Sequence, residues 1–288
     1  MENKQLNTDK NQTLFKYYLK IMGGVLLGWS FWFMVLVLLL RWLEPPFTAF
    51  TLQENWEELG KERYDLRQTW VPTNELPEHL KLAVIASEDQ RFYSHWGLDL
   101  AAIDKALEEK EKSGRIRGAS TITQQVAKNL FLWPAQSYFR KGIEAGIAVL
   151  LELLWTKERI MEVYLNIAEF GPGMFGVSTA SEFYYGKSPA QLTPEESARM
   201  ATVLPNPKLI EPKPASEYVM ERSLWILRNM EQLSGLSFLP EPKPDTVLRS
   251  VPDPIGLEID SLIRIDSIPD LKTSDSLYPA VLDSIRRF

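Results

Sequence analysis

The apolar positions of this chain follow two patterns, a continuous run near the N-terminus and a helical periodicity further on. Residues 21–40 read IMGGVLLGWSFWFMVLVLLL and carry no charged side chain. Twenty apolar residues in an α-helix span the hydrocarbon core of a bilayer. The run therefore predicts one transmembrane helix over residues 21–41. Before it lies a polar segment, residues 1–20, which we expect to be disordered up to the last turn before the span.

The charges that flank the run predict its orientation. Four lysines precede it, at positions 4, 10, 16 and 20, whereas Arg41 is the one cation close behind it. Since the flank richer in lysine and arginine stays in the cytoplasm, we expect a single-pass protein of the plasma (inner) membrane. Its N-terminus is then cytoplasmic and the remainder is periplasmic or extracytoplasmic. A cleaved signal peptide is the alternative, but the run is long and no small-residue cleavage site follows it.

Helical periodicity dominates the region after a connector at residues 42–70. Apolar spacing and capping residues predict helices over residues 77–88, 99–112, 121–133, 137–155, 156–166, 193–204 and 216–233, with a glycine-marked loop at 171–176. Strands and helices do not alternate, so the predicted fold class is mainly α. The predicted domain covers residues 71–236. Residues 237–288 form a Pro-rich, acidic C-terminal tail of unassigned function, in which the pattern indicates one short strand at 257–265.

Composition narrows the classes of function. Across 288 residues the formal net charge is −6 and the pI is about 5.2. These values argue against nucleic acid as a partner, because nucleic-acid binders normally carry a basic face. The chain has no cysteine and only two histidines. A disulfide framework, a thiolate metal site and a histidine-based zinc site are therefore not expected, and we predict no metal-binding residues.

Four polar blocks stand where the apolar pattern predicts helices or helix ends, a costly place for charges unless they face a cleft. They read Glu88-Asp89-Gln-Arg-Phe92-Tyr-Ser-His95, Gly118-Ala-Ser120-Thr121-Ile-Thr123-Gln124-Gln125, Arg140-Lys141-Gly-Ile-Glu144 and Lys157-Glu-Arg-Ile-Met-Glu162-Val-Tyr164-Leu-Asn166. Together they resemble the peptidoglycan glycosyltransferases, whose patterns run E-D-x-x-F-x-x-H, G-x-S-T-x-T-Q-Q, R-K-x-x-E and K-x-x-I-L-E-x-Y-L-N. The chain departs from that family at Ala119, Met161 and Ser178.

This resemblance covers about residues 70–233 and implies a lysozyme-like helical glycosyltransferase domain behind the membrane helix. It implies an inverting enzyme that polymerises lipid II into linear glycan strands and releases undecaprenyl diphosphate. The implied partners are lipid II, the growing glycan strand, the plasma membrane and cell-wall synthesis or division proteins. The S-x-x-K, S-D-N and K-T-G motifs of penicillin-binding transpeptidases are not visible as a set, so we expect no transpeptidase activity.

Glu88 is the candidate catalytic base. It ends an apolar segment, which should desolvate its carboxylate in part and raise its pKa toward the range where a base is useful. The alternative is a helix end exposed to water, although helix C-termini disfavour acids. By resemblance, Asp89, Phe92 and His95 support the loop that holds Glu88.

Glu144 is the second candidate catalytic carboxylate. Positions 140, 144, 148 and 151 share one helical face, and the continuation of that face is apolar, so we expect Arg140 and Glu144 at a cleft. A surface ion pair of little energetic value is the alternative. The resemblance gives Glu144 the task of stabilising the reacting sugar or the leaving diphosphate.

The leaving diphosphate requires cations and hydrogen-bond donors. The predicted substrate-binding residues are Lys128, Arg140, Lys141, Ser120, Thr121, Gln124 and Gln125. No tightly bound cofactor is expected; the resemblance alone implies that Mg²⁺ or Mn²⁺ assists at the diphosphate. The fourth block is interpreted as structural, and Asn166 is a supporting residue, a helix cap in the first place and a sugar contact in the second.

Two other functions stay open at this point. One is a lysozyme-like hydrolase or lytic transglycosylase, which would share a helical core and a glutamate at a cleft. The other is a membrane-anchored scaffold that binds lipid II at a degenerate site. The presence of both glutamates and of the phosphate-facing cations favours synthesis over either alternative.

Overall fold

The computed structural model describes residues 2–52, 69–113, 118–133 and 137–239. By its internal contacts the chain divides into two units, Met1–Leu236 and Ser237–Phe288. Most of the second unit, including the strand predicted at residues 257–265, lies outside the described residues. The fold below is that of the first unit.

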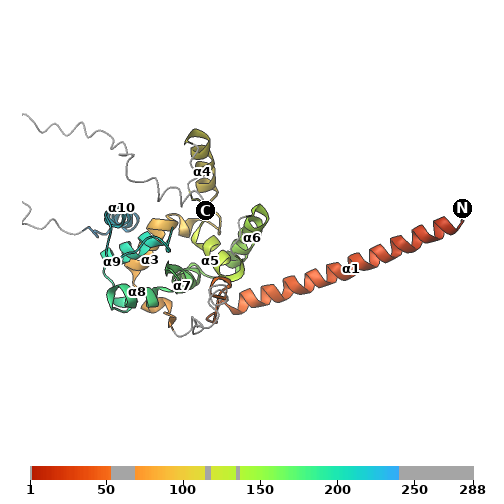
Figure 1. Cartoon of the computed structure of the whole chain (residues 1–288), viewed down its shortest axis with the longest axis horizontal. Coiled ribbons are helices and arrows are strands. Elements are labelled where there is room, and N and C mark those ends of the chain that lie inside the picture. Colours follow the sequence, from red (N-terminus) through yellow and green to blue (C-terminus); the bar gives the residue numbers. More distant parts are fainter. Residues whose placement is uncertain (1, 53–68, 114–117, 134–136, 240–288) are drawn as a thin grey trace, which may run out of the picture. The chain divides into compact units, whose positions relative to one another are not determined.

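Helix α1 runs from Glu2 to Leu39 and contains the apolar run (Figure 1). The expectation of a disordered segment at residues 1–20 was wrong, because the helix begins at Glu2. That segment contains neither proline nor glycine, so a helix formed by the span can propagate through it. Residues Phe15–Leu39 are long and apolar enough to cross a membrane, a property that signal sequences share.

The mainly helical fold predicted for the domain is confirmed. Its helices are α3 (Glu78–Glu88), α4 (Leu100–Ser113), α5 (Ile122–Phe131), α6 (Tyr138–Leu154), α7 (Lys157–Ile167), α8 (Val177–Tyr185), α9 (Pro194–Val203) and α10 (Glu217–Ser234). Short 3₁₀ helices lie at Thr73–Glu75, Phe92–Ser94 and Pro189–Gln191. Five of the α-helices begin where the sequence places a capping hydroxyl, since Thr121, Ser137, Thr156, Thr193 and Ser216 each accept a backbone N–H of the first turn.

The glycine-marked loop is a small hairpin. Strand β1 (Glu169–Gly171) pairs antiparallel with β2 (Met174–Phe175), and α8, which the sequence pattern did not predict, follows directly. Gly176 joins β2 to α8 with a φ of +83°, and a Cβ there would lie 2.8 Å from the Asn166 carbonyl oxygen. A glycine is therefore required at this position, because an L side chain would meet both strain and a backbone clash.

Two groups of helices position the site. Helix α5 packs against both α6 and α7, and α3 packs against α9 and α10 (Figure 1). The core between them holds large, fully buried side chains, among them Leu80, Phe92, Ile122, Leu151 and Tyr164. The C-terminal end of α3 consequently meets the N-terminal half of α5, and this junction is where the first two polar blocks of the sequence come together.

The end of α1 is joined to the domain. The indole Nε1 of Trp155 donates a 2.8 Å hydrogen bond to the Val37 carbonyl oxygen. The guanidinium of Arg159 donates to the Leu40 carbonyl at 3.0 Å. Since carbonyl groups at a helix C-terminus lack intrahelical donors, these side chains satisfy groups that would otherwise face solvent or lipid.

Candidate active site

Glu88 is the last residue of α3, and its half-buried carboxylate is held on both oxygens. The Nε2 amide of Gln125, on α5, donates to one oxygen at 2.9 Å. The hydroxyl of Ser87 donates to the other at 3.2 Å. The alternative of a helix end exposed to water is therefore not what forms, since this carboxylate lies at the contact between two helices.

Burial raises the pKa of Glu88 above its ordinary value, as the apolar approach to this residue predicts. The hydrogen bonds from Gln125 and Ser87 and the charges of Arg222 and Lys128 act in the opposite direction. A carboxylate desolvated in this way is a stronger proton acceptor than one in water, while its donors keep it in a fixed position.

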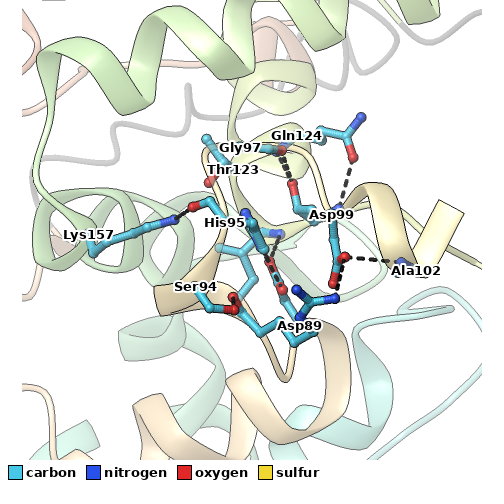
Figure 2. Close-up of polar contacts among 12 residues, drawn as sticks. Asp89, Ser94, His95, Gly97, Asp99, Ala102, Thr123, Gln124 and Lys157 are labelled. Carbon is cyan, nitrogen blue, oxygen red and sulfur yellow. Dashed lines mark hydrogen bonds and ion pairs between the residues drawn. The ribbon is translucent and has the colours of Figure 1, made fainter.

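Asp89 joins α3 to α5. Its carboxylate accepts the backbone N–H of Ile122, the first residue of α5, at 3.0 Å. His95 Nε2 donates to both oxygens of the same carboxylate, at 2.9 and 3.0 Å, and Figure 2 shows the two side chains facing each other. An acid after α3 is thus explained by the N-terminus of the next helix, whose dipole favours a negative charge.

An ion pair between Lys157 and Glu152 supports the loop that contains His95. Lys157 Nζ donates to the His95 carbonyl oxygen at 2.9 Å, as Figure 2 shows. It also donates to Glu152 at 2.7 Å. Its ammonium also lies 4.4 Å from the centroid of the Phe92 ring. Thr123 of α5 donates to the same Glu152 carboxylate at 2.6 Å. Phe92 and His95 are therefore placed as supports for the loop after Glu88.

Thr121 and Gln124 lie in the interior, with 2% and 3% of their surface exposed. They form a capping box, in which Thr121 Oγ1 accepts the Gln124 N–H at 3.1 Å and Gln124 Oε1 accepts the Thr121 N–H at 3.0 Å. The Thr121 hydroxyl donates to the Gly97 carbonyl at 2.6 Å. These contacts differ from the expectation of free donors to a diphosphate, because the Thr121 hydroxyl and the Gln124 amide oxygen are used to build the start of α5.

Glu144 lies on the buried face of α6, with 2% of its surface exposed. One oxygen accepts from Arg140 Nη1 at 3.0 Å, and the other accepts a short hydrogen bond from Lys141 Nζ. Lys141 also donates to the hydroxyl of Ser120 at 3.0 Å, which brings the second and third blocks together. The interpretation as a surface ion pair is excluded by this burial.

Lys128 is close enough to both glutamates for their charges to affect its pKa. Burial lowers the pKa of its ammonium; the charge of Glu144 opposes that effect, and Glu88 opposes it more weakly. Lys141 and Arg140 lower the pKa further, so all three predicted cations are within electrostatic range of one another. The Phe50 ring centroid lies 5.5 Å from Lys128 Nζ. The chain thus concentrates positive charge beside two carboxylates, as expected for a site that binds a diphosphate.

Asn166 holds the start of the domain. Its side chain accepts the Val71 N–H and donates to the Val71 carbonyl, both at 2.8 Å, and it donates to the Glu162 carbonyl at 2.8 Å. All of its hydrogen bonds go to backbone, and Ala168 is the C-cap of α7. The expectation that Asn166 caps its helix was wrong, because the side chain binds a segment 95 residues away in sequence.

Some residues of the site were missed by the sequence interpretation. Tyr164, assigned to packing, donates from its hydroxyl to Gln125 Oε1 at 3.1 Å. Arg222, on α10, contributes positive potential at Glu88. No local pattern identifies Arg222, because it lies in a helix far from the four blocks; Tyr164 lies within the fourth block, where its hydroxyl is the one signal that distinguishes it from a packing residue.

Among the described residues no group of three or more histidines, aspartates or glutamates is arranged to hold a metal ion. Both oxygens of Glu144 already accept from cations, and Glu88 accepts from neutral donors. The arrangement fits proton transfer at one carboxylate and charge neutralisation around the other. Substitution at a sugar carbon with a phosphate leaving group requires both of these roles.

Comparison with known proteins gives a consistent result. The family model described as "Transglycosylase" matches residues 55–231. A "Biosynthetic peptidoglycan transglycosylase" from Pseudomonas putida (strain KT2440) is 50% identical over 208 residues, 71% of this chain and 87% of the relative. Proteins with the same description from Stutzerimonas stutzeri (strain A1501) and Ectopseudomonas mendocina (strain ymp) are 48% and 47% identical, over 73% and 76% of this chain and 88% and 93% of each relative.

Proposed function

The chain belongs to the transglycosylase family, and from that premise we propose that it polymerises lipid II into linear glycan strands, releasing undecaprenyl diphosphate. The observation that carries this proposal is the buried carboxylate of Glu144, which accepts from Arg140 and Lys141, together with Lys128, whose pKa both Glu144 and Glu88 affect. A base and a cationic diphosphate site next to each other suit glycosyl transfer from a lipid diphosphate. The relatives named as biosynthetic peptidoglycan transglycosylases support the same class of substrate.

Glu88 takes the proton of the attacking hydroxyl in this proposal. The 4-hydroxyl of the acceptor N-acetylglucosamine loses its proton to the carboxylate as its oxygen forms a bond to the anomeric carbon of the donor. The bond from that carbon to the diphosphate breaks on the opposite face, which inverts the configuration. The raised pKa of Glu88 and its fixed position at the end of α3 support this role.

Lys128, Arg140 and Lys141 hold the departing diphosphate. The Arg140 guanidinium can bind two phosphate oxygens at once, whereas each ammonium acts as a compact point charge. Glu144 keeps Arg140 and Lys141 in position through its two oxygens. When these cations turn toward the diphosphate, the Glu144 carboxylate becomes available to the reacting sugar. Ser120 is joined to this cluster of cations because its hydroxyl accepts a hydrogen bond from Lys141.

A divalent cation held by the protein does not fit this site. Each oxygen of Glu144 already accepts from a cationic side chain, and the described residues contain no cluster of metal ligands. A magnesium or manganese ion would have to arrive on the diphosphate of the substrate itself. No step of the proposed mechanism depends on it.

The apolar helix anchors the enzyme at the plasma membrane in our proposal, with a cytoplasmic N-terminus and the domain on the outer side. The lysines before the span support this orientation. Helix α6 exposes large apolar side chains in its own right, with Tyr138 98%, Phe139 77% and Leu153 63% exposed. Such a surface suits an enzyme whose substrate carries a polyprenyl chain, because it can lie against the lipid.

Polymerisation of purified lipid II by the full-length protein in detergent tests the proposal. We expect glycan chains from the wild type and a rate at least about 100-fold lower from Glu88→Gln. A neutral amide carries no charge whose burial would be unfavourable, so the melting temperature of Glu88→Gln should not fall. Glu78→Gln, which changes an exposed glutamate of the same helix, is the matched control and should keep the wild-type rate.

Each failure has a distinct meaning. Wild-type rates from Glu88→Gln would end the assignment of the base while leaving the function intact. Binding of lipid II without polymer would favour the scaffold instead. Release of soluble fragments from finished peptidoglycan, without polymer from lipid II, would indicate a lytic enzyme.

A further inference from the structure

A chain of two hydrogen bonds leads from the centre of α7 to Glu88. The Tyr164 hydroxyl lies 3.1 Å from Gln125 Oε1, and Gln125 Nε2 lies 2.9 Å from Glu88 Oε2. Tyr164 has no exposed surface and is among the largest fully buried side chains of the described residues. Its ring is therefore held by the core, and its hydroxyl has a fixed direction.

The direction of the Gln125 amide decides whether it stabilises Glu88. An ionised carboxylate accepts hydrogen bonds and cannot donate one, so the amide helps only when its NH₂ group faces Glu88. Its carbonyl oxygen then faces the core and needs a donor. The Tyr164 hydroxyl supplies that donor, and burial raises the pKa of Tyr164 well above its ordinary value, so the proton stays on the hydroxyl at working pH.

We propose that Tyr164 is a positioning residue of the active site, which orients the Gln125 amide and thereby fixes the position and basicity of Glu88. The inference rests on the proposed role of Glu88 as the base. Hydrogen bonds in series polarise one another, so a donor at the amide oxygen also strengthens the N–H that faces the carboxylate. Tyr164 acts on the reaction through Gln125 without contact with Glu88 itself.

Other groups also act on Glu88, and their effects stay constant when Tyr164 changes. Lys128 of α5 and Arg222 of α10 bring positive charge, and Ser87 of α3 donates a hydrogen bond. Helix α9 contributes the Ala201 carbonyl, which lies 3.3 Å from Ser87 Oγ and is the alternative acceptor for its single hydroxyl proton. Asp89 and Glu88 are the acidic groups that face the Tyr164 ring from the end of α3.

The test is the pH profile of kcat/KM for lipid II polymerisation by the full-length enzyme. In Tyr164→Phe the Gln125 carbonyl loses its donor, the amide loses its fixed direction, and the ionised form of Glu88 becomes less favourable. The acid limb is the part of the profile where kcat/KM falls as Glu88 becomes protonated. It should move to higher pH by about half a unit or more, which lowers kcat/KM roughly threefold at pH values on that limb. Tyr184→Phe is the matched control, since the Tyr184 hydroxyl bonds to the Phe170 carbonyl at 3.4 Å; it should leave the limb in place.

Two further variants test whether the effect passes through Gln125. Gln125→Met removes the donor to Glu88 and should move the acid limb upward by about one pH unit or more. Adding Tyr164→Phe to Gln125→Met should then move the limb no further, because the two residues act in series. Independent, additive shifts would overturn the proposal.

A fluorotyrosine at position 164 covers the case in which Tyr164→Phe does not fold. Fluorination keeps the ring and makes the hydroxyl a stronger donor, so the acid limb should move to lower pH, opposite to Tyr164→Phe. An unmoved limb in folded Tyr164→Phe, or in the fluorotyrosine protein, would overturn the role of Tyr164. Full activity of Glu88→Gln would instead overturn the proposed base, so the two failures are distinguishable.

Discussion

At the scale of single residues, three acidic side chains of the candidate site are held in three different ways. Neutral donors and burial leave Glu88 able to take a proton. A helix N-terminus and a histidine hold Asp89. Two cations neutralise Glu144. In the proposed mechanism the same functional group therefore serves as a base, a structural joint and an electrostatic support, because the partners of each carboxylate differ.

The charge of Lys128 should control the basic limb of activity. Burial lowers its pKa from the ordinary lysine value, so the ammonium is lost as pH rises through that lowered pKa. Binding of the diphosphate then weakens on the alkaline side. In Lys128→Arg the side chain stays charged throughout, and we expect the basic limb of kcat/KM to move to higher pH by about one unit or more.

A lysine outside the site provides the control for that measurement. Lys187 pairs with Glu196 at 2.7 Å on the surface of α9, so Lys187→Arg should leave the basic limb where it is in the wild type. A basic limb unchanged in Lys128→Arg would contradict the assignment of Lys128 as the titrating cation.

At the scale of elements, the site depends on how helix ends meet. Helix α5 starts with a capping box at Thr121 and Gln124, and the carboxylate of Asp89 accepts its first N–H. The capping box fixes the first turn of α5, and the Asp89 carboxylate fixes that turn relative to the end of α3. Gln125 follows immediately, so its distance to Glu88 is determined by this junction more than by either helix alone.

Replacing Asp89 with alanine should therefore destabilise the fold. The Ile122 N–H and His95 Nε2 would both lose a buried acceptor, at a cost of about 3 kcal/mol in the free energy of unfolding. Denaturant unfolding of the purified protein measures this loss. Asp104→Ala, at an exposed position of α4, is the control and should stay within about 0.5 kcal/mol of the wild type. Equal stability of the Asp89 and Asp104 variants would show that the junction contributes little.

At the scale of the whole molecule, an apolar helix is joined directly to a catalytic domain. The bond from Trp155 to the Val37 carbonyl and that from Arg159 to the Leu40 carbonyl lie at the end of α1. The last turn of the helix is thus bonded to α7 and to the residue that ends α6. If α1 spans the bilayer as proposed, these bonds keep the site close to the membrane surface where the lipid-linked substrate lies.

The orientation can be measured with single cysteines, because the chain has none of its own. A membrane-impermeant maleimide should label Glu108→Cys in intact spheroplasts and should label Lys16→Cys only after permeabilisation. The exposed positions of Glu108 and Lys16 make both variants structurally mild. The reverse pattern would contradict the proposed topology. Loss of Lys16 from a shortened mature chain would identify the apolar run as a cleaved signal.

Much of the helical layout was predictable because it depends on neighbours in sequence. The capping hydroxyls at Thr121, Ser137, Thr156, Thr193 and Ser216 begin helices as predicted, since a cap acts within one turn. The glutamates and cations of the candidate site were singled out by the four polar blocks and their resemblance to a known family, and their roles stay predictions. The hairpin and α8 were missed, since a two-residue strand leaves almost no periodic signal.

The long-range partners of the polar side chains were decided by the tertiary structure alone. Asn166 binds the backbone of Val71, and the Tyr164 hydroxyl binds Gln125. The sequence by itself determined which residues are helical and which are too polar for the positions they occupy, because propensity and periodicity are local. It could not determine their partners, because a hydrogen bond between residues 39 or 95 positions apart exists only once the helices have packed.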